Sequence, residues 1–532
     1  MTIISFEFLL FVLAVVLVYY IVPKKKRWIV LLAGSFVFYW LNSKWLVFVL
    51  LGTSMTTYLF GLLLQRQNEK NKAVLQSNKE LSKEEKKRLK EKQKKKNRRI
   101  LAAGILLVLG ALLFLKYFNF FGDNLNALFS AAGTGWTIPY LKLLLPLGIS
   151  FYTLQAIAYL VDIYHGKVQA DRNPAKFLLF MSFFPQIIQG PIPRHGHLAD
   201  QLYEGHAFDY RRLCFGAQLM LWGFIKKLVI AERLAIPVNY LFENYRNYSG
   251  PIVFFAVALY GLQVYADFSG GMDIARGVAQ MLGIELALNF KQPYYSTSIE
   301  DFWRRWHITM GSWMKDYVFY PLSLSKAFTN LSRKSRKILG QFVGKRLPAF
   351  LAMFIAYFCV GFWHGANWKY IAYGVWNGCF IMSGILLEGV YQKSREICGI
   401  NESAVTWRLF RMLRTFVIVS FGRFFSRAAD LPTALDMFGR TFKHWRDITF
   451  ITNGTLLKLG LNNANWIVLS LFVIVLLYVD SRHEKGISFR EVFARQPLLF
   501  RWAIYIAAIL LVLIFGIYGP EYNVANFVYE QF

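Results

Sequence analysis

Apolar runs alternate with short basic segments along almost the whole chain. A helix needs about 20 predominantly apolar residues to cross the hydrocarbon core of a bilayer. The predicted spans, some of them shorter than this, lie at Ile3–Val22, Trp28–Leu41, Trp45–Leu64, Ile100–Phe118, Leu141–Tyr164, Leu213–Ile230, Ile252–Phe268, Phe350–Trp363, Tyr370–Leu387, Phe416–Phe425, Trp466–Val479 and Trp502–Tyr518. The pattern predicts an all-α polytopic membrane protein, and we expect residues 1–532 to form a single membrane domain.

The segments between these runs predict which side of the membrane each loop occupies. Lys and Arg accumulate in cytoplasmic loops, and basic loops here include Pro23–Arg27, Arg333–Arg346 and Arg482–Arg501. Residues 65–99 form a longer Lys/Glu-rich insertion, which we expect to be a cytoplasmic solvated helix or a disordered segment. Since one crossing follows the last basic loop, the tail of residues 519–532 is predicted to lie outside the cell.

Several apolar runs carry helix-breaking or polar residues. Pro146 and Gly148 interrupt one run, and Phe177–Ile188 is too short to span, as expected of a re-entrant segment. Asp267 and Asp273 flank a glycine pair at predicted membrane depth. Because interrupted helices of this kind commonly line cavities, we expect a helix break there.

Composition argues against nucleic-acid binding and against a metal site. The chain has 532 residues, of which 56% are hydrophobic, and its net charge is +30. Since the basic residues follow the loop pattern, nucleic-acid binding is disfavoured. Four scattered cysteines form neither a disulfide framework nor a metal-ligand spacing, so no metal site is expected.

Two histidines stand out as candidate chemistry. Ionisable side chains within a bilayer are costly and are read first as functional. His364 ends an apolar run between Trp363 and Gly365, whereas His307 lies among Arg304 and other cations. A structural histidine at the membrane interface is an open alternative for His307, and less so for His364.

The motifs around these histidines resemble the membrane-bound O-acyltransferase (MBOAT) family, and more closely its bacterial alginate, peptidoglycan and polysaccharide O-acetyltransferase type. The resemblance covers most of the chain. Its motifs are Trp303-Arg-Arg-Trp-His307, Gly361-Phe-Trp-His-Gly-Ala-Asn-Trp368, Pro146-Leu-Gly-Ile-Ser-Phe-Tyr152, Gln189-Gly-Pro-Ile-Pro-Arg194, Asp267-Phe-Ser-Gly270 and Asn289-Phe. It implies a ring of tilted helices with re-entrant segments around a central tunnel, in a bacterial cytoplasmic membrane.

The resemblance also implies roles for individual residues. His364 corresponds to the principal catalytic histidine and His307 to the second. A neutral imidazole is a suitable base for a hydroxyl proton, so we expect His364 to be the general base and His307 to orient a substrate or polarise the thioester carbonyl. Further candidates for lining the donor site or tunnel are Trp303, Trp306, Asp267, Asn367, Trp363, Arg304 and Arg305.

The donor is expected to be acetyl-CoA or an acyl-carrier thioester on the cytoplasmic side. Arg304, Arg305 and Lys315 are candidates for contacts with the phosphates of coenzyme A. Ordinary anchoring by cations at the inner membrane surface explains the same three residues equally well. No permanently bound cofactor is expected.

The chain ends in Phe527-Val-Tyr-Glu-Gln-Phe532, which resembles an F-x-Y-x-x-F ending of this family. By that resemblance Tyr529 receives the acyl group and passes it to an extracellular SGNH-type transferase or esterase. A phenol is a fair leaving group, so a tyrosyl ester is an activated carrier. The alternative for these aromatic residues is an anchor at the membrane interface.

Together these features predict acyl transfer across the membrane, with acetyl as the expected group, for O-acylation of an extracellular or cell-wall polysaccharide. One alternative is D-alanyl transfer to teichoic acid from an acyl-carrier protein. A different class, an ion-coupled transporter, would use the intramembrane carboxylates Asp267 and Asp273. The absence of a visible inverted repeat disfavours a transporter.

Overall fold

Helices account for nearly all secondary structure in the computed structural model, which describes residues 1–78, 80–187 and 189–518. Within these ranges there is no strand, only an isolated antiparallel bridge between Phe290 and Trp306. Seven helical stretches are long and apolar enough to cross a membrane, and a bent pair, Trp368–Leu386 with Glu388–Ile397, could supply an eighth. The predicted all-α polytopic fold is therefore confirmed.

The chain divides into two compact units. The first comprises residues 1–217 and 275–287. Its helices, with the short 3₁₀ and π segments labelled η, are α1 (Phe6–Ile21), η1 (Lys24–Lys26), α2 (Arg27–Ser43), η2 (Lys44–Leu46), α3 (Val47–Ser77), α4 (Lys83–Leu112), η3 (Leu113–Tyr117), α5 (Phe118–Ala131), α6 (Ile149–Tyr164), α7 (Pro174–Ser182), α8 (Phe184–Ile187), α9 (His195–Tyr203) and most of α10 (Tyr210–Phe224).

The second unit comprises residues 218–274 and 288–532, of which the structure describes those up to 518. Its elements are η4 (Ile225–Ala231), α11 (Glu232–Asn244), η5 (Tyr245–Asn247), most of α12 (Gly250–Met281), η6 (Pro293–Tyr295), α13 (Ile299–Arg305), α14 (Ile308–Met314), η7 (Lys315–Phe319), α15 (Tyr320–Ser323), α16 (Lys326–His364), α17 (Trp368–Leu386), α18 (Glu388–Ile397), α19 (Val405–Arg427), α20 (Leu431–Arg440), η8 (Thr449–Ile451), η9 (Thr455–Lys458), α21 (Asn463–Glu484), α22 (Phe489–Ala494) and α23 (Leu498–Phe515).

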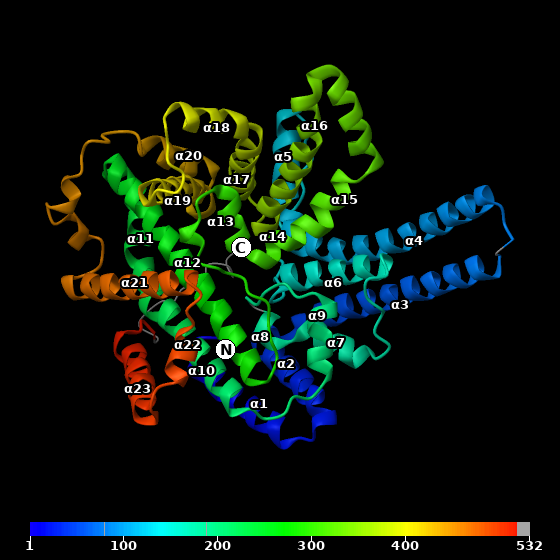
Figure 1. Cartoon of the computed structure of the whole chain (residues 1–532), viewed down its shortest axis with the longest axis horizontal. Coiled ribbons are helices and arrows are strands. Elements are labelled where there is room, and N and C mark those ends of the chain that lie inside the picture. Colours follow the sequence, from blue (N-terminus) through cyan, green and yellow to red (C-terminus); the bar gives the residue numbers. More distant parts are fainter. Residues whose placement is uncertain (79, 188, 519–532) are drawn as a thin grey trace. The chain divides into compact units, whose positions relative to one another are not determined.

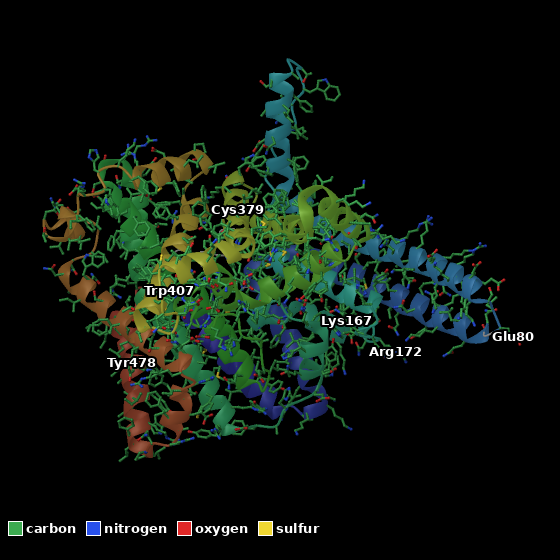
Figure 2. The ribbon with its side chains drawn as sticks, turned by 45° about the horizontal axis from the view of Figure 1, so that its top comes forward. Glu80, Lys167, Arg172, Cys379, Trp407 and Tyr478 are labelled. Carbon is green, nitrogen blue, oxygen red and sulfur yellow. The ribbon has the colours of Figure 1, made fainter. Side chains whose placement is uncertain are left out.

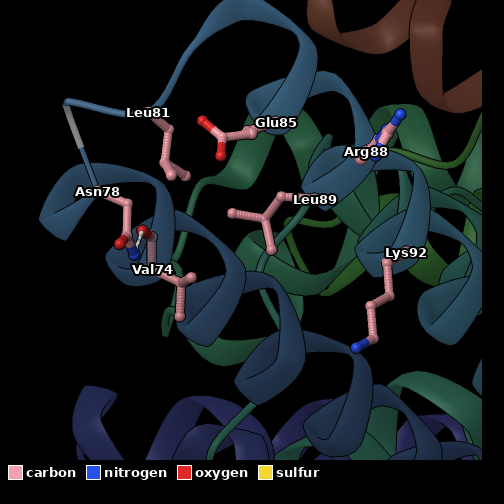
Figure 3. A pocket seen from close by; sticks show the side chains of 7 residues that line it. All are labelled: Val74, Asn78, Leu81, Glu85, Arg88, Leu89 and Lys92. Carbon is pink, nitrogen blue, oxygen red and sulfur yellow. Dashed lines mark hydrogen bonds between the residues drawn. The ribbon is translucent and has the colours of Figure 1, made fainter.

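The insertion at residues 65–99 is largely helical. It forms the outer parts of α3 and α4, which pack against each other as a long helical hairpin with Glu80 at its tip (Figures 1 and 2). Asn97 donates a hydrogen bond to Asn68 at 2.6 Å and accepts one from Asn71 at 3.2 Å. Near the tip, the side chains of Val74, Leu81 and Leu89 line a common pocket (Figure 3). A capping box of Ser82 and Glu85 begins α4. Of the two forms predicted for this segment, the helix is the one observed.

Two local expectations need correction. The helical start expected at Leu141 is wrong, since residues 141–148 are non-helical and α6 begins at Ile149. The interruption expected at Pro146 and Gly148 is confirmed, and Gly148 adopts a left-handed conformation (φ 71°) directly before the helix. The break expected after Phe268 is absent, since α12 continues without interruption to Met281. Its Gly270 instead allows a close approach: an added Cβ there would lie 2.9 Å from the carbonyl oxygen of Gly223.

The basic stretch at residues 333–346 is a folded turn within α16. The helix reverses direction around Gly340, where φ is 74°, a left-handed value that glycine adopts without steric cost. Across the turn the Ser335 hydroxyl donates to the Gly344 carbonyl oxygen at 2.7 Å. The second arm of α16 then runs to His364, which is its last residue. The arm of α16 that ends in His364 therefore begins at this turn.

Candidate functional site

His364 is held by the tight packing of α16 against α17. An added Cβ at Gly361 would lie 2.4 Å from the carbonyl oxygen of Tyr370, and one at Gly374 would lie 2.2 Å from that of Tyr357. Real Cβ atoms do not come this close, so glycine at both positions lets the two backbones touch, as small residues do between membrane helices. The sequence Gly361-Phe-Trp-His364 thus places the imidazole at a helix end fixed by backbone contact.

His307 lies in the connection between α13 and α14 and has a left-handed backbone, with φ 46° and ψ 52°. Such a conformation costs a residue other than glycine about 1–3 kcal/mol and persists only where the surroundings enforce it. Here the segment after α12 pairs with it: Phe290 bridges Trp306, and the Ile308 N–H donates to the Asn289 carbonyl oxygen at 3.0 Å.

The side chain of Asn289 contacts the imidazole directly. Its amide nitrogen lies 3.2 Å from His307 Nδ1, and its amide oxygen accepts from the backbone N–H and the hydroxyl of Thr309, both at 2.9 Å. Asn289 belongs to one of the family-like motifs, but the sequence alone did not identify its partners. Through its side chain and its carbonyl oxygen, Asn289 contacts three consecutive residues, 307–309.

Both histidine rings lie close to the ring of Trp363. The Trp363 ring is centred 5.8 Å from the His307 ring and 5.1 Å from the His364 ring. Both histidines are buried, with exposures of 2% and 5%. Phe268 packs edge-to-face on His307 at 4.9 Å, and Tyr373 does the same on His364 at 5.5 Å. The structure thus brings together the two residues that the sequence singled out, in an aromatic environment.

Burial lowers the pKa of His307 well below 6.5, and the neighbouring His364 lowers it further. The imidazole of His307 is therefore neutral at physiological pH. A neutral imidazole carries one N–H donor and one lone pair, so it can stabilise a developing oxyanion or accept a proton, depending on its tautomer. Within the described ranges no group of three or more His, Cys, Asp and Glu side chains could hold a metal ion.

Trp303 and Trp306 form part of the aromatic packing beside the histidines. Trp306 stacks on Phe302, with ring centres 5.4 Å apart, and Trp303 lies 6.3 Å from Tyr373. Arg423, which sequence reasoning did not identify, is 2% exposed, and its guanidinium lies 5.3 Å from the centre of the Trp306 ring. This cation–π contact supports the tryptophan that directly precedes His307.

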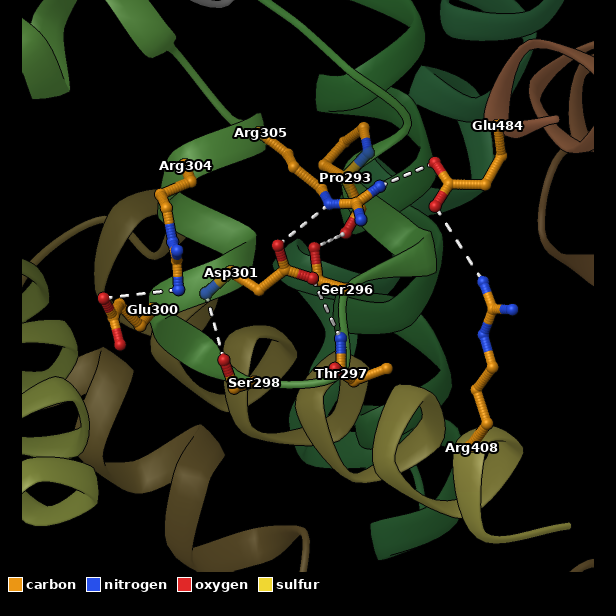
Figure 4. Close-up of polar contacts among 10 residues, drawn as sticks. All are labelled: Pro293, Ser296, Thr297, Ser298, Glu300, Asp301, Arg304, Arg305, Arg408 and Glu484. Carbon is orange, nitrogen blue, oxygen red and sulfur yellow. Dashed lines mark hydrogen bonds and ion pairs between the residues drawn. The ribbon is translucent and has the colours of Figure 1, made fainter. Parts of the chain in front are cut away.

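Two candidate cations, Arg304 and Arg305, differ in their surroundings (Figure 4). Arg305 pairs with Asp301 at 3.1 Å and with Glu484 at 2.7 Å, so carboxylates already compensate its charge. Arg304 is exposed, and its ion pair with Glu300, one helical turn away at 3.3 Å, is correspondingly weak. Of the two, Arg304 is the one whose charge remains accessible.

Asp267 lies in a buried charge cluster and is not an open carboxylate. It forms an ion pair with Lys227, which also contacts Glu232 at 2.6 Å. Next to it, Lys226 pairs with Asp273 at 2.6 Å. The two lysines lie on the π-helical segment η4, within a run that the sequence suggested only as a span. This location gives both aspartates a structural partner.

The remaining candidates have other roles or lie elsewhere. Asn367 caps α17, its side chain accepting from the Lys369 N–H at 3.0 Å, and Trp368 is half exposed. Lys315 is exposed on η7. Tyr529 and the rest of the tail lie outside the described residues.

Comparison with known proteins places these residues in a family context. The model of MBOAT, the membrane-bound O-acyltransferase family, matches residues 168–396, which include both histidines and Asn289. A probable alginate O-acetylase of Pseudomonas syringae pv. tomato is 31% identical over 427 residues, covering 80% of this chain and 71% of the relative. A peptidoglycan O-acetyltransferase of Helicobacter pylori is 30% identical, covering 63% of each chain. A teichoic acid D-alanyltransferase of Streptococcus thermophilus is 28% identical, covering 47% of this chain and 58% of the relative.

Proposed function

The chain belongs to the membrane-bound O-acyltransferase family, and from this premise we propose that it transfers an acetyl group from a cytoplasmic thioester towards an extracellular or cell-wall polysaccharide. The relatives named for acetyl transfer act on alginate and peptidoglycan, and both are polysaccharides of the cell exterior. In this proposal the protein resides in the bacterial cytoplasmic membrane with its C-terminus outside.

The observation that carries the proposal is the buried pair of imidazoles around Trp363. In acyl transfer the acceptor hydroxyl attacks the thioester carbonyl, the new C–O bond forms and the C–S bond breaks. His364 takes the hydroxyl proton and returns it to the departing thiolate, while His307 stabilises the negative charge on the carbonyl oxygen. Both roles are available to neutral imidazoles and need no resident cofactor.

The donor is proposed to be acetyl-CoA. Its phosphates are too strongly charged to enter a low-dielectric site, so only the acetyl thioester approaches the histidines. Because Arg305 is already paired with two carboxylates, the exposed Arg304 and Lys315 are the better candidates for phosphate contacts.

The acetyl group is proposed to leave through Tyr529 in the C-terminal tail, and an extracellular SGNH-type protein would then pass it to the polymer. This step rests on the F-x-Y-x-x-F ending of the sequence. Mass spectrometry of the C-terminal peptide from cells that acetylate their polymer is expected to find an acetyl adduct on Tyr529. Its consistent absence while polymer acetylation continues would refute the carrier role.

D-alanyl transfer to teichoic acid is the second candidate, favoured by the similarity to a teichoic acid D-alanyltransferase. Ion-coupled transport is less compatible with the structure, because lysines already neutralise Asp267 and Asp273.

The deciding experiment supplies purified protein in vesicles with isotope-labelled acetyl-CoA or, separately, with a labelled D-alanyl carrier-protein thioester. Label on the protein or acceptor from acetyl-CoA, lost in His364→Gln, is expected. Label from the D-alanyl thioester alone would favour the second candidate, and passage of unmodified solute would indicate a transporter.

A further inference from the structure

We propose that Asn289 is a positioning residue that holds His307 in the tautomer protonated at Nε2, so that this ring acts as a hydrogen-bond donor and leaves the role of base to His364. The inference rests on the proposed acyl transfer for its functional meaning. Its structural content, the location of one proton, can be tested without any assay of activity.

The orientation of the Asn289 amide follows from its contact with Thr309. A backbone N–H can only donate, and that of Thr309 lies 2.9 Å from Asn289 Oδ1. The Thr309 hydroxyl lies at the same distance from this oxygen. The oxygen of the amide therefore faces Thr309, and both of its lone pairs are engaged. The nitrogen must then face the other way.

The amide nitrogen has two hydrogens to place and two acceptors within reach. His307 Nδ1 lies 3.2 Å from it, and the sulfur of Met272 lies 3.5 Å from it. When it donates to both, all four hydrogen-bonding positions of the Asn289 amide are used. This arrangement makes Nδ1 an acceptor, and the proton of the neutral imidazole then resides on Nε2.

The opposite tautomer fits the same atoms less well. Nδ1 also lies 3.3 Å from Asn289 Oδ1, so a proton on Nδ1 would have to share an oxygen that already accepts two shorter hydrogen bonds. The Asn289 nitrogen would then keep only the weak thioether acceptor of Met272. Since buried amide hydrogens are costly to leave without a good acceptor, the protein favours Nε2–H.

The backbone reinforces this geometry. The carbonyl oxygen of Asn289 accepts from the Ile308 N–H at 3.0 Å, so one residue holds both the main chain and the ring of the histidine segment. Phe268 and Trp363 contact the ring from other sides. Together these contacts fix the direction of Nε2. A pKa well below 6.5 keeps the ring neutral, so that one nitrogen donates and the other accepts.

The consequence is that the two histidines have different roles. A donor aimed at the thioester carbonyl oxygen is strengthened as negative charge develops there, whereas a ring whose Nδ1 is engaged by Asn289 cannot collect the hydroxyl proton through that atom. Removing one such donor typically lowers kcat by about 10²–10³-fold.

The direct test is nitrogen NMR of the full-length protein carrying ¹⁵N-labelled histidine in lipid nanodiscs, with His307 assigned by its loss in His307→Gln. The expected wild-type signal is a neutral ring protonated at Nε2. In Asn289→Asp a carboxylate replaces the donating amide, so the expected signal shows a proton on Nδ1. Asn377→Asp is the matched control, since Asn377 is equally buried but bonds to its own helix, and it should leave the His307 signal unchanged. A wild-type ring protonated at Nδ1 would overturn the proposal.

Activity gives a second readout that separates the roles. The amide N–H of glutamine can stand in for Nε2–H, so His307→Gln is expected to retain at least tenfold more kcat than His307→Ala. His364→Gln should be as inactive as His364→Ala, because an amide cannot act as a base. Equal loss in both His307 variants would refute the donor role. If no acyl thioester supports transfer by the wild-type protein while the NMR result holds, the proposed function fails and the tautomer assignment stands.

Discussion

Replacing Lys227 with methionine should destabilise the protein more than any other single change in the buried charge cluster. The Lys227, Asp267 and Glu232 side chains are 2%, 2% and 6% exposed, and the lysine contacts both carboxylates. Methionine keeps most of the volume but removes the cation that contacts both carboxylates. Breaking a buried ion pair in this way costs about 3–5 kcal/mol.

The change in unfolding free energy can be measured by unfolding the full-length protein in mixed micelles with an increasing fraction of SDS. The double variant Lys227→Met/Asp267→Asn removes one of the stranded charges and is expected to recover part of the loss, a coupling visible in a double-mutant cycle. Lys226→Met is the matched control. Its partner Asp273 is 16% exposed and can be partly hydrated, so a smaller loss is expected.

The reasoning would be refuted if Lys227→Met unfolded at the same SDS fraction as the wild type. It would also be refuted if the double variant were less stable than the sum of the single changes. Either result would mean that the cluster does not stabilise the fold through its charges.

Three further predictions concern single side chains around the site. Arg305→Ala should lower thermal stability measurably, because it leaves Asp301 and Glu484 without their closest cation. Arg304→Ala should leave stability unchanged and raise the KM for acetyl-CoA. The reverse pattern would contradict the pairing in Figure 4. Asn367→Ala should cost about 1 kcal/mol of unfolding free energy through loss of the α17 cap, with Asn367→Asp as the control that keeps it, and equal stability of the two variants would exclude a capping role. Because its pKa lies well below 6.5, His307 stays neutral as the pH falls from 7 to 6. The fall of kcat on the acid side of the pH–rate profile should therefore occur at the same pH in His307→Gln and in the wild type. A shift of that fall would show that His307 titrates in this range.

The sequence predicted the helical membrane fold and singled out two histidines that the fold brings close to Trp363, but tertiary contacts decided several details. The glycine pair after Phe268 looked like a helix break, and yet α12 continues through it, and Gly270 instead permits the close approach to Gly223. Local sequence cannot distinguish a glycine that ends a helix from one that admits a neighbouring backbone.

The same limit applies to polar residues. Asp267 looked like an intramembrane carboxylate available for function, because its partner Lys227 is distant in sequence and lies within another apolar run. Asn289 was visible as part of a family-like motif, but only the folded chain shows that it contacts His307 and Thr309. Burial and ion pairing are properties of the fold, whereas a sequence pattern indicates only which residues are capable of them.

The two polar centres of the second unit differ in charge, and this difference bears on how the proposed charged thioester donor could react. In the cluster around Lys227, ion pairs compensate full charges, and Arg305 is likewise paired. The histidine site is instead buried among aromatic rings, and its His307 is neutral. In a low-dielectric site a neutral imidazole needs no counter-ion before the reaction, and its N–H interacts most strongly with the charge that appears only in the transition state. For the proposed donor, a site of this kind would favour the uncharged thioester over the phosphates attached to it. In the proposed reaction, only the acetyl end of the donor, and not the whole donor, would have to reach the two histidines.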